Sequence, residues 1–95
     1  MIGMITLFVY DEIAAPLARQ IAEALRAKPR EACEVRVNSY GGSAAEAFAI
    51  HSALKSHGGP VTVTVEGVAF SAATLIVCAA RCVACASSAC LRASP

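Results

Sequence analysis

The sequence predicts an α/β protein in which parallel strands alternate with helices in the order β-α-β-α-β-α. Strand-like segments alternate with helix-like segments of ten or more residues, and such segments are long enough for right-handed crossovers between parallel strands. The chain has 95 residues, so it forms one domain at most. Its hydrophobic share of 57% against a charged share of 16% supports a packed core. Ligands are then expected at the carboxyl ends of the strands.

The first part of the chain contains a strand followed by a helix. Residues 4–10 form a short apolar run rich in β-branched and aromatic side chains, which predicts a strand buried on both faces. Across residues 14–27, apolar side chains recur every four residues at Leu17, Ile21 and Leu25. This spacing predicts an amphipathic helix, and a proline two residues after it helps to end it.

Two more pairs of a strand and a helix follow. Residues 34–38 alternate apolar and polar side chains, which predicts a second strand, and residues 44–57 are expected to form a second helix. Residues 61–65 alternate Val with Thr and predict a third strand. Residues 67–80 are interpreted as a turn that leads into a buried helix.

Charge and hydropathy exclude two classes of partner. The formal net charge is +1, with basic residues interleaved among acids, so there is no basic patch for nucleic acid or an anionic membrane. The longest uncharged stretch, residues 67–80, is shorter than the roughly 18 to 20 residues that span a bilayer. The N-terminal segment has no basic stretch before its apolar run, unlike a secretory signal. We therefore expect a cytoplasmic chain without nucleic acid or membrane partners.

The first candidate site is the turn at residues 38–43 (NSYGGS), between the second predicted strand and its helix. Its two glycines allow positive φ angles and let a ligand approach backbone amides at the start of the helix. A turn of this kind can bind an oxyanion, but glycine pairs between a strand and a helix are more often plain connections. Taken alone, the turn leaves both interpretations open.

The second candidate site is residues 67–74 (GVAFSAAT), where Ser71 comes just past the third predicted strand. A hydroxyl in this position points into the crevice at the strand ends. The amide of Ala72 and the positive end of the helix then favour a developing oxyanion. The alternative interpretation is that Ser71 only caps the N-terminus of the helix.

Three segments together resemble the Clp protease proteolytic-subunit family, especially its phage prohead-protease-like branch. They are residues 10–13 (YDEI), 35–42 (VRVNSYGG) and 67–73 (GVAFSAA), and the resemblance runs from about residue 5 to residue 80. It implies the ClpP/crotonase-like fold, of which this chain has the N-terminal half only.

The resemblance also implies a serine-type endopeptidase and assigns its site residues. Ser71 matches the nucleophile, Gly42 and Ala72 match the amides of the oxyanion hole, and Gly41 supports the turn. The family implies a homo-oligomeric ring that acts on peptides or unfolded proteins. The ring is fed by an AAA+ unfoldase that uses the ATP, whereas prohead-type relatives cut phage capsid or scaffold proteins. No cofactor is implied for the peptidase chain.

The chain departs from the family pattern at the turn and at the general base. Tyr40 stands where the family usually has proline, although both glycines are kept. The resemblance implies a base histidine roughly 22 to 26 residues after the nucleophile, where this sequence has Ala93 or Ser94. The only histidines, His51 and His57, precede Ser71 and are expected to be partly exposed helix residues. No general base is found in the expected position.

These departures lead us to expect a truncated chain. Residues 1–80 are interpreted as a partial ClpP/crotonase-like domain, and residues 81–95 as a degenerate tail rich in Cys, Ala and Ser. The tail is consistent with a fragment or with a frameshifted continuation of a longer gene. Because the base is missing, we expect the 95-residue chain to be inactive.

The cysteines suggest a metal site only weakly. Cys78, Cys82 and Cys85 have the C-x₃-C-x₂-C spacing of radical enzymes with an iron–sulfur cluster, and the last two could form a redox pair or half a zinc site. The radical-enzyme motif has an aromatic residue where this chain has Ala84. Cys90 could add a fourth zinc ligand, but there is no second C-x₂-C pair. Small apolar fillers are the expected role, without a metal.

Three classes of function remain open after these observations. The first is a ClpP-like serine endopeptidase subunit, and the second is a noncatalytic ClpP-like assembly subunit or fragment. The third is a crotonase-type acyl-CoA enzyme, which uses the same fold and paired oxyanion amides. That enzyme class does not need a serine in the second turn, and this chain has no obvious acid–base carboxylate after it.

Overall fold

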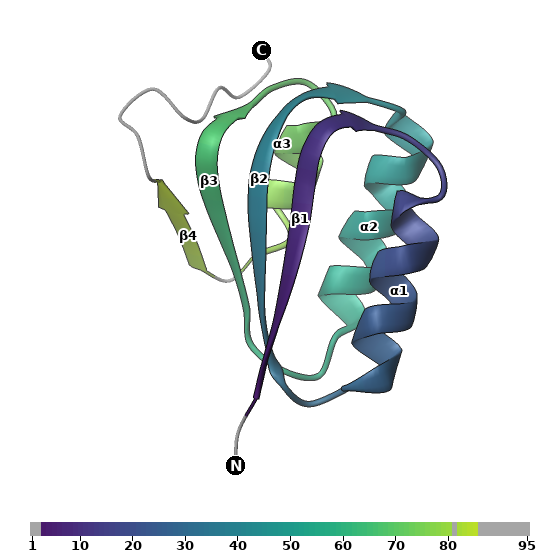
Figure 1. The fold of residues 1–95 in the computed structure, drawn as a ribbon, viewed down its shortest axis with the longest axis vertical. Coiled ribbons are helices and arrows are strands. Elements are labelled where there is room, and N and C mark those ends of the chain that lie inside the picture. The colour runs from purple at the N-terminus through teal and green to yellow at the C-terminus, as the bar shows by residue number, and fades with distance from the viewer. Residues whose placement is uncertain (1–2, 81, 86–95) are drawn as a thin grey trace.

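The strands form one parallel sheet whose spatial order follows the sequence, β1-β2-β3-β4 (Figure 1). The computed structural model describes residues 3–80 and 82–85. The strands are β1 (Met4–Ile13), β2 (Ala32–Gly42), β3 (Val61–Ala69) and β4 (Cys82–Cys85). The helices are α1 (Leu17–Ala27), α2 (Ala44–Ser56) and α3 (Ala73–Val77). The predicted α/β class with parallel strands is confirmed.

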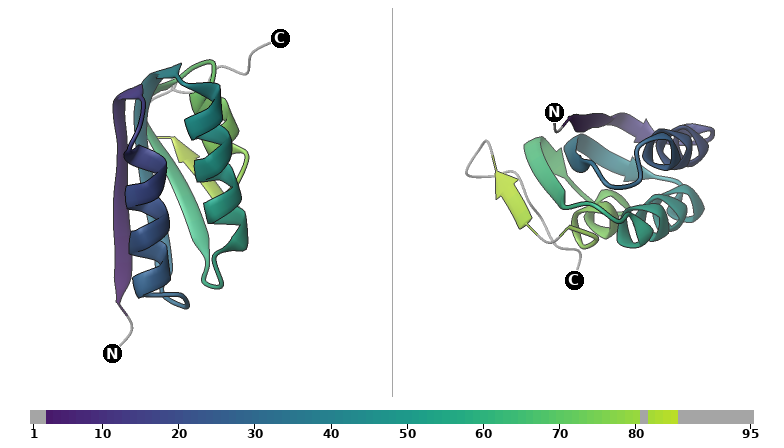
Figure 2. Two further views of the ribbon diagram at one scale, coloured as in Figure 1. Left: turned by 90° about the vertical axis from the view of Figure 1, so that its right-hand side faces the viewer. Right: turned by 90° about the horizontal axis from the view of Figure 1, so that it is seen from below.

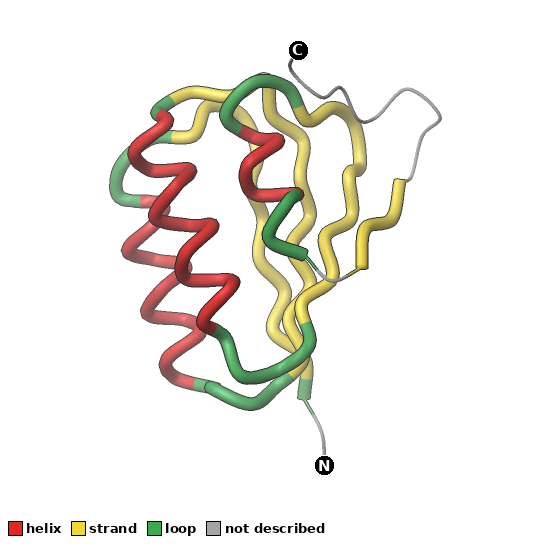
Figure 3. Tube along the Cα trace, turned by 180° about the vertical axis from the view of Figure 1, so that it is seen from behind, coloured by secondary structure: helices red, strands yellow, loops and turns green. Residues whose placement is uncertain are grey.

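All three helices lie on the same face of the sheet, as the two views of Figure 2 show. Parallel strands in sequential order require this arrangement when every crossover is right-handed. Helix α2 packs between α1 and α3, and α3 packs against β2 and β3. Figure 3 shows that the turns after β1, β2 and β3 gather at one end of the molecule, far from the N-terminus. Within the described residues, no helix combines the length and the hydropathy needed to cross a membrane.

The strands run further than the sequence pattern predicts. β1 continues to Ile13 and β2 to Gly42, because their pairing resumes after a register shift. β3 continues to Ala69, so the turn expected from Gly67 begins later, and α3 is correspondingly short. The segment expected to be a tail contains β4, which pairs with β3. The alternation of buried and exposed side chains is interrupted at a register shift, so the sequence pattern predicts strands that are too short.

The expectation that the first strand is buried on both faces is wrong. Ile5, Val9 and Ile13 of β1 are buried under the helices, whereas Phe8 and Tyr10 are exposed on the other face. The physical reason is that α1, α2 and α3 all lie on one side of the sheet, so within residues 3–80 and 82–85 no layer covers the opposite face of β1. The structure is therefore a two-layer fold over its described residues.

The core lies between the sheet and the helices. Its fully buried side chains come from alternate positions of the three long strands and from one stripe of each helix. They include Val35 and Val37 of β2, Ile50 of α2 and Ile76 of α3. Each such side chain contributes about 1.5 to 3 kcal/mol through removal of apolar surface from water. Burial of this stripe, more than intrinsic propensity, holds the five-residue α3 in place.

Glu46 connects the beginnings of the first two helices. The hydroxyl of Ser43 accepts a hydrogen bond from the Glu46 amide at 3.2 Å and caps α2. The carboxylate of Glu46 accepts a hydrogen bond from the amide of Ala18 at 3.0 Å, near the start of α1. No side chain from the start of α1 itself caps that helix. One carboxylate thus satisfies a free amide of a neighbouring helix and fixes the spacing of the two helices.

The helix-free face of the sheet carries a polar network across β1, β2 and β3. The carboxylate of Glu66 accepts hydrogen bonds from the Tyr10 hydroxyl and from Arg36. Arg36 also pairs with Glu34 at 3.4 Å. The hydrogen bonds from Tyr10 and then Arg36 lower the pKa of Glu66. The network keeps Arg36 and both carboxylates paired on a face that none of the described helices covers.

Cys33 is expected to resist alkylation in the folded protein. The side chain is 2% exposed, and burial, followed by the charge of Glu34, raises the pKa of its thiol from 9.0 to about 11. We expect a maleimide at about pH 8 to modify the exposed Cys78 well before Cys33, because the thiolate is the reactive form. Peptide mapping of modification against time measures both rates, and equal rates would contradict this assignment.

The same pKa shift predicts how stability depends on pH. Between about pH 9 and pH 11 the unfolded chain loses the Cys33 proton while the folded chain keeps it. The folded state then binds more protons than the unfolded state, so the free energy of unfolding falls as the pH rises through this window. Below about pH 9 the Cys33 thiol is protonated in both states, so this residue adds no pH dependence to the free energy of unfolding. Urea unfolding of wild type and Cys33→Ser at both ends of the window isolates its contribution.

Candidate active site

Two turns meet at the carboxyl ends of β2 and β3. The first contains Gly41 and Gly42 at the end of β2, and the second contains Ser71, between β3 and α3. A side chain built on Gly41 would lie 3.0 Å from Cβ of Ser71 and 3.3 Å from the amide nitrogen of Ala72. The absence of a side chain at Gly41 is therefore what lets the two turns come into contact.

Both glycines have backbone angles that other residues avoid. The φ angles are +121° at Gly41 and +144° at Gly42, in a region that L-residues with a Cβ rarely occupy. Gly41 faces the Ser71 turn, whereas Gly42 faces the backbone of Ile13, the last residue of β1. Beyond Gly42, the amide of Ser43 donates to the carbonyl oxygen of Ile13 at 2.8 Å. The glycine pair is thus held between the ends of β1 and β3.

Ser39 anchors the glycine turn from inside the protein. It is 1% exposed, and its hydroxyl donates to the carbonyl oxygen of Asp11 at 2.5 Å. The same oxygen accepts a hydrogen bond from the amide of Gly41 at 3.0 Å. The carbonyl oxygen of Ser39 accepts from the amide of Phe70, next to Ser71, at 3.1 Å. Ser39 therefore ties the end of β2 to both neighbouring turns.

Ser71 has a strained backbone and an accessible side chain. Its φ angle is +53°, which is uncommon for a residue other than glycine and is often found at functional sites. The residue is exposed. Its carbonyl oxygen accepts hydrogen bonds from the amide of Thr74 at 3.0 Å and from the hydroxyl of Thr74 at 2.6 Å. These two contacts stabilise the strained turn through its carbonyl group and leave the Ser71 hydroxyl available.

The interpretation of Ser71 as a helix cap is wrong. The N-cap position of α3 is Ala72, which is in the helical region and provides no side-chain cap. Within residues 3–80 the Ser71 hydroxyl forms no hydrogen bond, and the Ala72 amide has no acceptor. A free hydroxyl next to a free amide has the chemical groups needed to attack a carbonyl and to stabilise the resulting oxyanion.

The structure brings most of the predicted site residues together. Ser71, Ala72 and Gly41 are in direct proximity, and Gly42 follows in the same turn. Tyr40, which replaces the family's usual proline, is 73% exposed and packs on Phe70 with ring centroids 5.2 Å apart. This aromatic contact gives the turn a second connection to the residue before Ser71. The assigned roles of these residues remain predictions.

The two histidines are engaged elsewhere. Nδ1 of His51 donates to the carbonyl oxygen of Leu75 at 2.8 Å, and Nε2 of His57 donates to that of Glu31 at 2.6 Å. Both side chains are half-buried on or next to α2. Neither is hydrogen-bonded to Ser71 over the part of the chain that the structure describes. These contacts support the expectation that the histidines are structural.

The cysteine hypotheses fall largely outside the described side chains. Cys78 is exposed just after α3. Cys82 and Cys85 lie in β4, but their side chains are outside the described set. Cys90, Ala93 and Ser94 also lie outside the described residues. Among the described residues there is no group of three potential metal ligands.

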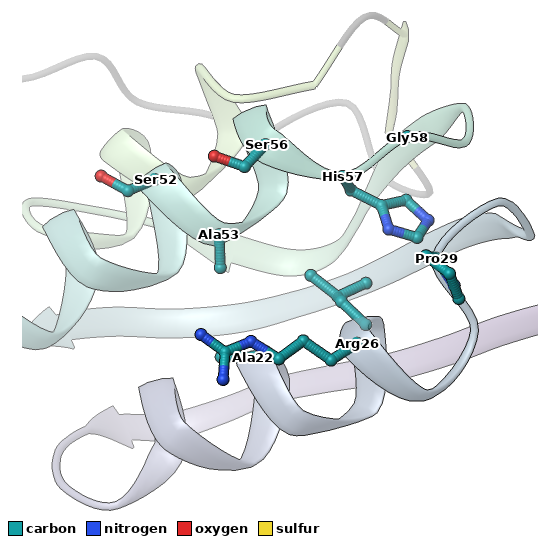
Figure 4. Close-up of a pocket in the computed structure, with 9 residues that line it drawn as sticks. Ala22, Arg26, Pro29, Ser52, Ala53, Ser56, His57 and Gly58 are labelled. Atoms are coloured by element: carbon teal, nitrogen blue, oxygen red, sulfur yellow. The ribbon is translucent and has the colours of Figure 1, made fainter.

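A separate cavity lies at the opposite end of the fold from the two turns. It has a volume of about 400 Å³ and lies between the C-terminal ends of α1 and α2. Figure 4 shows that Arg26 and Pro29 line one side and that Ser56 and His57 line the other. These residues precede β2 and β3, at the amino ends of the strands. The cavity is therefore not part of the candidate active site.

The sequence alone does not reveal that Ser39, Asn38 and Thr74 support this site through side-chain hydrogen bonds. Asn38 belongs to the turn predicted at residues 38–43, and its side-chain oxygen accepts a hydrogen bond from the amide of Val68 at 3.2 Å. The available signal was a polar residue next to Ser39 at the end of an otherwise alternating strand. That pattern does not identify its partner, because the partner lies 30 residues further along the chain.

The fold and the two turns together define an α/β protein with a strand-end site formed by a glycine pair and an exposed serine. The chain belongs to the Clp protease family, since the model of that family, described as Clp protease, matches residues 2–91. A comparison with curated proteins found no match.

The solved structures that are similar to the chain include two of ClpP1. A point mutant of ClpP1 from Listeria monocytogenes has 28% sequence identity and a TM-score of 0.72. ClpP1 from the same organism has 24% identity and a TM-score of 0.60, which supports the fold alone. In both cases the match covers 79% of this chain and 46% of the other chain. The chain therefore spans less than half the length of these relatives, and its fold corresponds to their N-terminal part.

Proposed function

We propose that this chain provides the nucleophile and the oxyanion-binding backbone of a ClpP-like serine endopeptidase subunit. The observation that carries the proposal is the contact between the two turns, where an exposed serine with a φ angle of +53° lies against Gly41. Strain at an exposed nucleophile is maintained only when surrounding contacts enforce it. Here Thr74 and Gly41 enforce it from two sides.

In the proposed reaction, Oγ of Ser71 attacks the carbonyl carbon of a peptide bond. The hydroxyl proton passes to a general base and then to the leaving amine, and water later releases the acyl group from Ser71. The amides of Ala72 and Gly42 stabilise the negative charge that develops on the carbonyl oxygen. Among the described residues neither histidine is placed to act as the base. The base is therefore assigned to a residue beyond this set or to another subunit.

Assembly and partners are further parts of the proposal, and they rest on family membership. The chain is proposed to work in a homo-oligomeric ring in the cytoplasm, on peptides or unfolded proteins. An AAA+ unfoldase delivers the substrate, or phage capsid proteins are the substrate in the prohead-type case.

Labelling with a fluorophosphonate probe tests the proposed nucleophile. Serine proteases that lack one triad member retain about 10³-fold acceleration from the oxyanion hole and binding. We therefore expect slow labelling that occurs at Ser71 in preference to other serines, even without a base in the described site. Intact-mass spectrometry followed by peptide mapping measures the extent and the position.

Two variants make this test specific. Ser71→Ala is expected to abolish labelling, whereas Ser52→Ala, which removes an exposed serine of α2, is expected to leave it unchanged. Labelling spread evenly over the exposed serines would show that Ser71 has no special reactivity. No labelling of folded protein would also contradict the proposal and would favour a noncatalytic assembly subunit.

A further inference from the structure

Asn38 lies where β2 loses register with both of its neighbours. On one side Tyr10 pairs with Asn38, but Glu12 pairs with Gly41, so β2 has an extra residue relative to β1. On the other side, Val37 pairs with Val65 and Ser39 pairs with Ala69, so β3 has extra residues relative to β2. Beyond Asn38, the ends of β1, β2 and β3 that carry the candidate active site therefore pair in a different register from the rest of the sheet.

The side chain of Asn38 replaces the missing ladder contact on the β3 side. Its Oδ1 accepts a hydrogen bond from the amide of Val68, within the extra segment of β3, at 3.2 Å. A side chain on Gly67 would lie 2.8 Å from Cγ of Asn38 and would collide with its amide group. Gly67 therefore leaves the space that the Asn38 side chain occupies. Regular backbone pairing resumes at Phe70, whose amide donates to Ser39.

From these contacts we propose that Asn38 is a positioning residue for Ser71. It holds the extra segment of β3 against β2, so that Ser71 emerges next to Gly41 with its hydroxyl and the Ala72 amide directed to one site. The inference rests on the proposed function, because the property being positioned is the reactivity of Ser71. Asn38 does not contact the reacting atoms and acts only through the segment from Gly67 to Phe70.

The location of Asn38 separates positioning from overall stability. The residue is exposed, and the five paired positions of β2 and β3 before it do not depend on its side chain. The core residues nearest in sequence, Val35 and Val37, point to the opposite face and are fully buried. Loss of the side chain is therefore expected to leave the folded core intact while the segment before Ser71 gains freedom.

The test compares fluorophosphonate labelling of Ser71 in the wild-type chain, Asn38→Ala and Asn38→Asp. A misplacement of about 1 Å can cost about 100-fold in rate, so we expect Asn38→Ala to slow labelling by about 10- to 100-fold. Asn38→Asp keeps an acceptor oxygen for the Val68 amide and is expected to restore most of the rate. Thr62→Ala, on the neighbouring strand β3 and without a side-chain hydrogen bond among the described residues, is the control for a general effect of substitution in the sheet.

A double-mutant cycle with Gly67→Ala tests the proposed contact independently of labelling. In the wild-type background a new Cβ at position 67 would displace the Asn38 amide, and hydrogen exchange at Val68 should accelerate. In the Asn38→Ala background that space is empty, so Gly67→Ala should add little. Amide exchange of Val68 by NMR is the readout, and additive effects of the two substitutions would overturn the contact.

The outcomes distinguish this inference from the proposed function. If Ser71 is labelled in the wild-type chain and the rate in Asn38→Ala is within about twofold of the wild-type rate, the positioning role alone is overturned. A slow Asn38→Ala that Asn38→Asp does not rescue would also overturn it, since the acceptor oxygen would then be irrelevant. Absence of labelling at wild-type Ser71 would overturn the proposed function and the positioning role together.

Discussion

Gly42→Ala is expected to destabilise the folded protein by about 2 to 6 kcal/mol, the sum of a strained backbone angle and a steric overlap. The φ angle of +144° is one that alanine avoids. The new Cβ would lie 2.7 Å from the amide nitrogen of Ile13 and would also overlap the carbonyl oxygen of that residue. Ile13 is fully buried, and its carbonyl oxygen is fixed by the Ser43 amide, so β1 cannot simply move away.

Gly3→Ala is the matched control for this substitution. A side chain on Gly3 would also meet another residue, but the contact is with the end of the flexible Glu31 side chain, which can rotate away. Urea unfolding is therefore expected to show a small change for Gly3→Ala and a large decrease in midpoint for Gly42→Ala. Small domains have about 5 to 15 kcal/mol of stability in total, so the expected loss is a large fraction. Equal midpoints for the two variants would contradict the described close approach of β1 and β2.

The order of elements could be predicted from the sequence because it depends on local patterns. Alternating Val and Thr in β3 reflect one buried and one open face, and the spacing of Leu17, Ile21 and Leu25 reflects the stripe that α1 buries. The exposed face of β1 could not be predicted in the same way. Its Phe8 and Tyr10 are apolar or aromatic like core residues, and only the placement of the helices leaves them uncovered.

The candidate active site was predictable in its residues but not in its contacts. The glycine pair and Ser71 are conspicuous because each sits at the end of a predicted strand. Their proximity depends on register shifts at both edges of β2, and a shift of pairing leaves no mark in the composition of a strand. The hydrogen bonds of Ser39 and Asn38 connect residues about 28 and 30 positions apart, beyond the reach of local spacing rules.

These contacts indicate how the fold maintains a strained serine turn. Ser39 ties β2 to β1 from the buried side, and Asn38 ties β2 to β3 from the exposed side. Thr74 then binds the carbonyl oxygen of Ser71 from the first turn of α3. The side chains of Ser39 and Asn38 thus replace backbone pairing that the register shifts remove, and the side chain of Thr74 holds the turn that follows. The position of Ser71 consequently depends on how firmly α3 is packed beneath it.

Truncation of Ile50 tests that dependence on packing. Ile50 is fully buried in α2, which packs against both α1 and α3. Ile50→Ala is expected to lower the free energy of unfolding by about 2 to 5 kcal/mol, since it removes buried apolar atoms and leaves a cavity. Thermal and urea unfolding measure the loss. α3 begins two residues after Ser71, so looser packing of α3 is expected to displace the serine turn. Fluorophosphonate labelling of Ser71 in the folded fraction of Ile50→Ala is therefore expected to be slower than in the wild-type chain.

Phe48→Ala provides the comparison within the same helix. Phe48 is 57% exposed, so its truncation removes a larger side chain but little buried surface. Its effect on the free energy of unfolding is expected to stay below about 1 kcal/mol, with labelling of Ser71 unchanged. If Ile50→Ala destabilises the protein but labelling of its folded fraction matches that of Phe48→Ala, the core between α2 and α3 does not control the serine turn. The polar contacts from Ser39, Asn38 and Thr74 would then be sufficient to hold it.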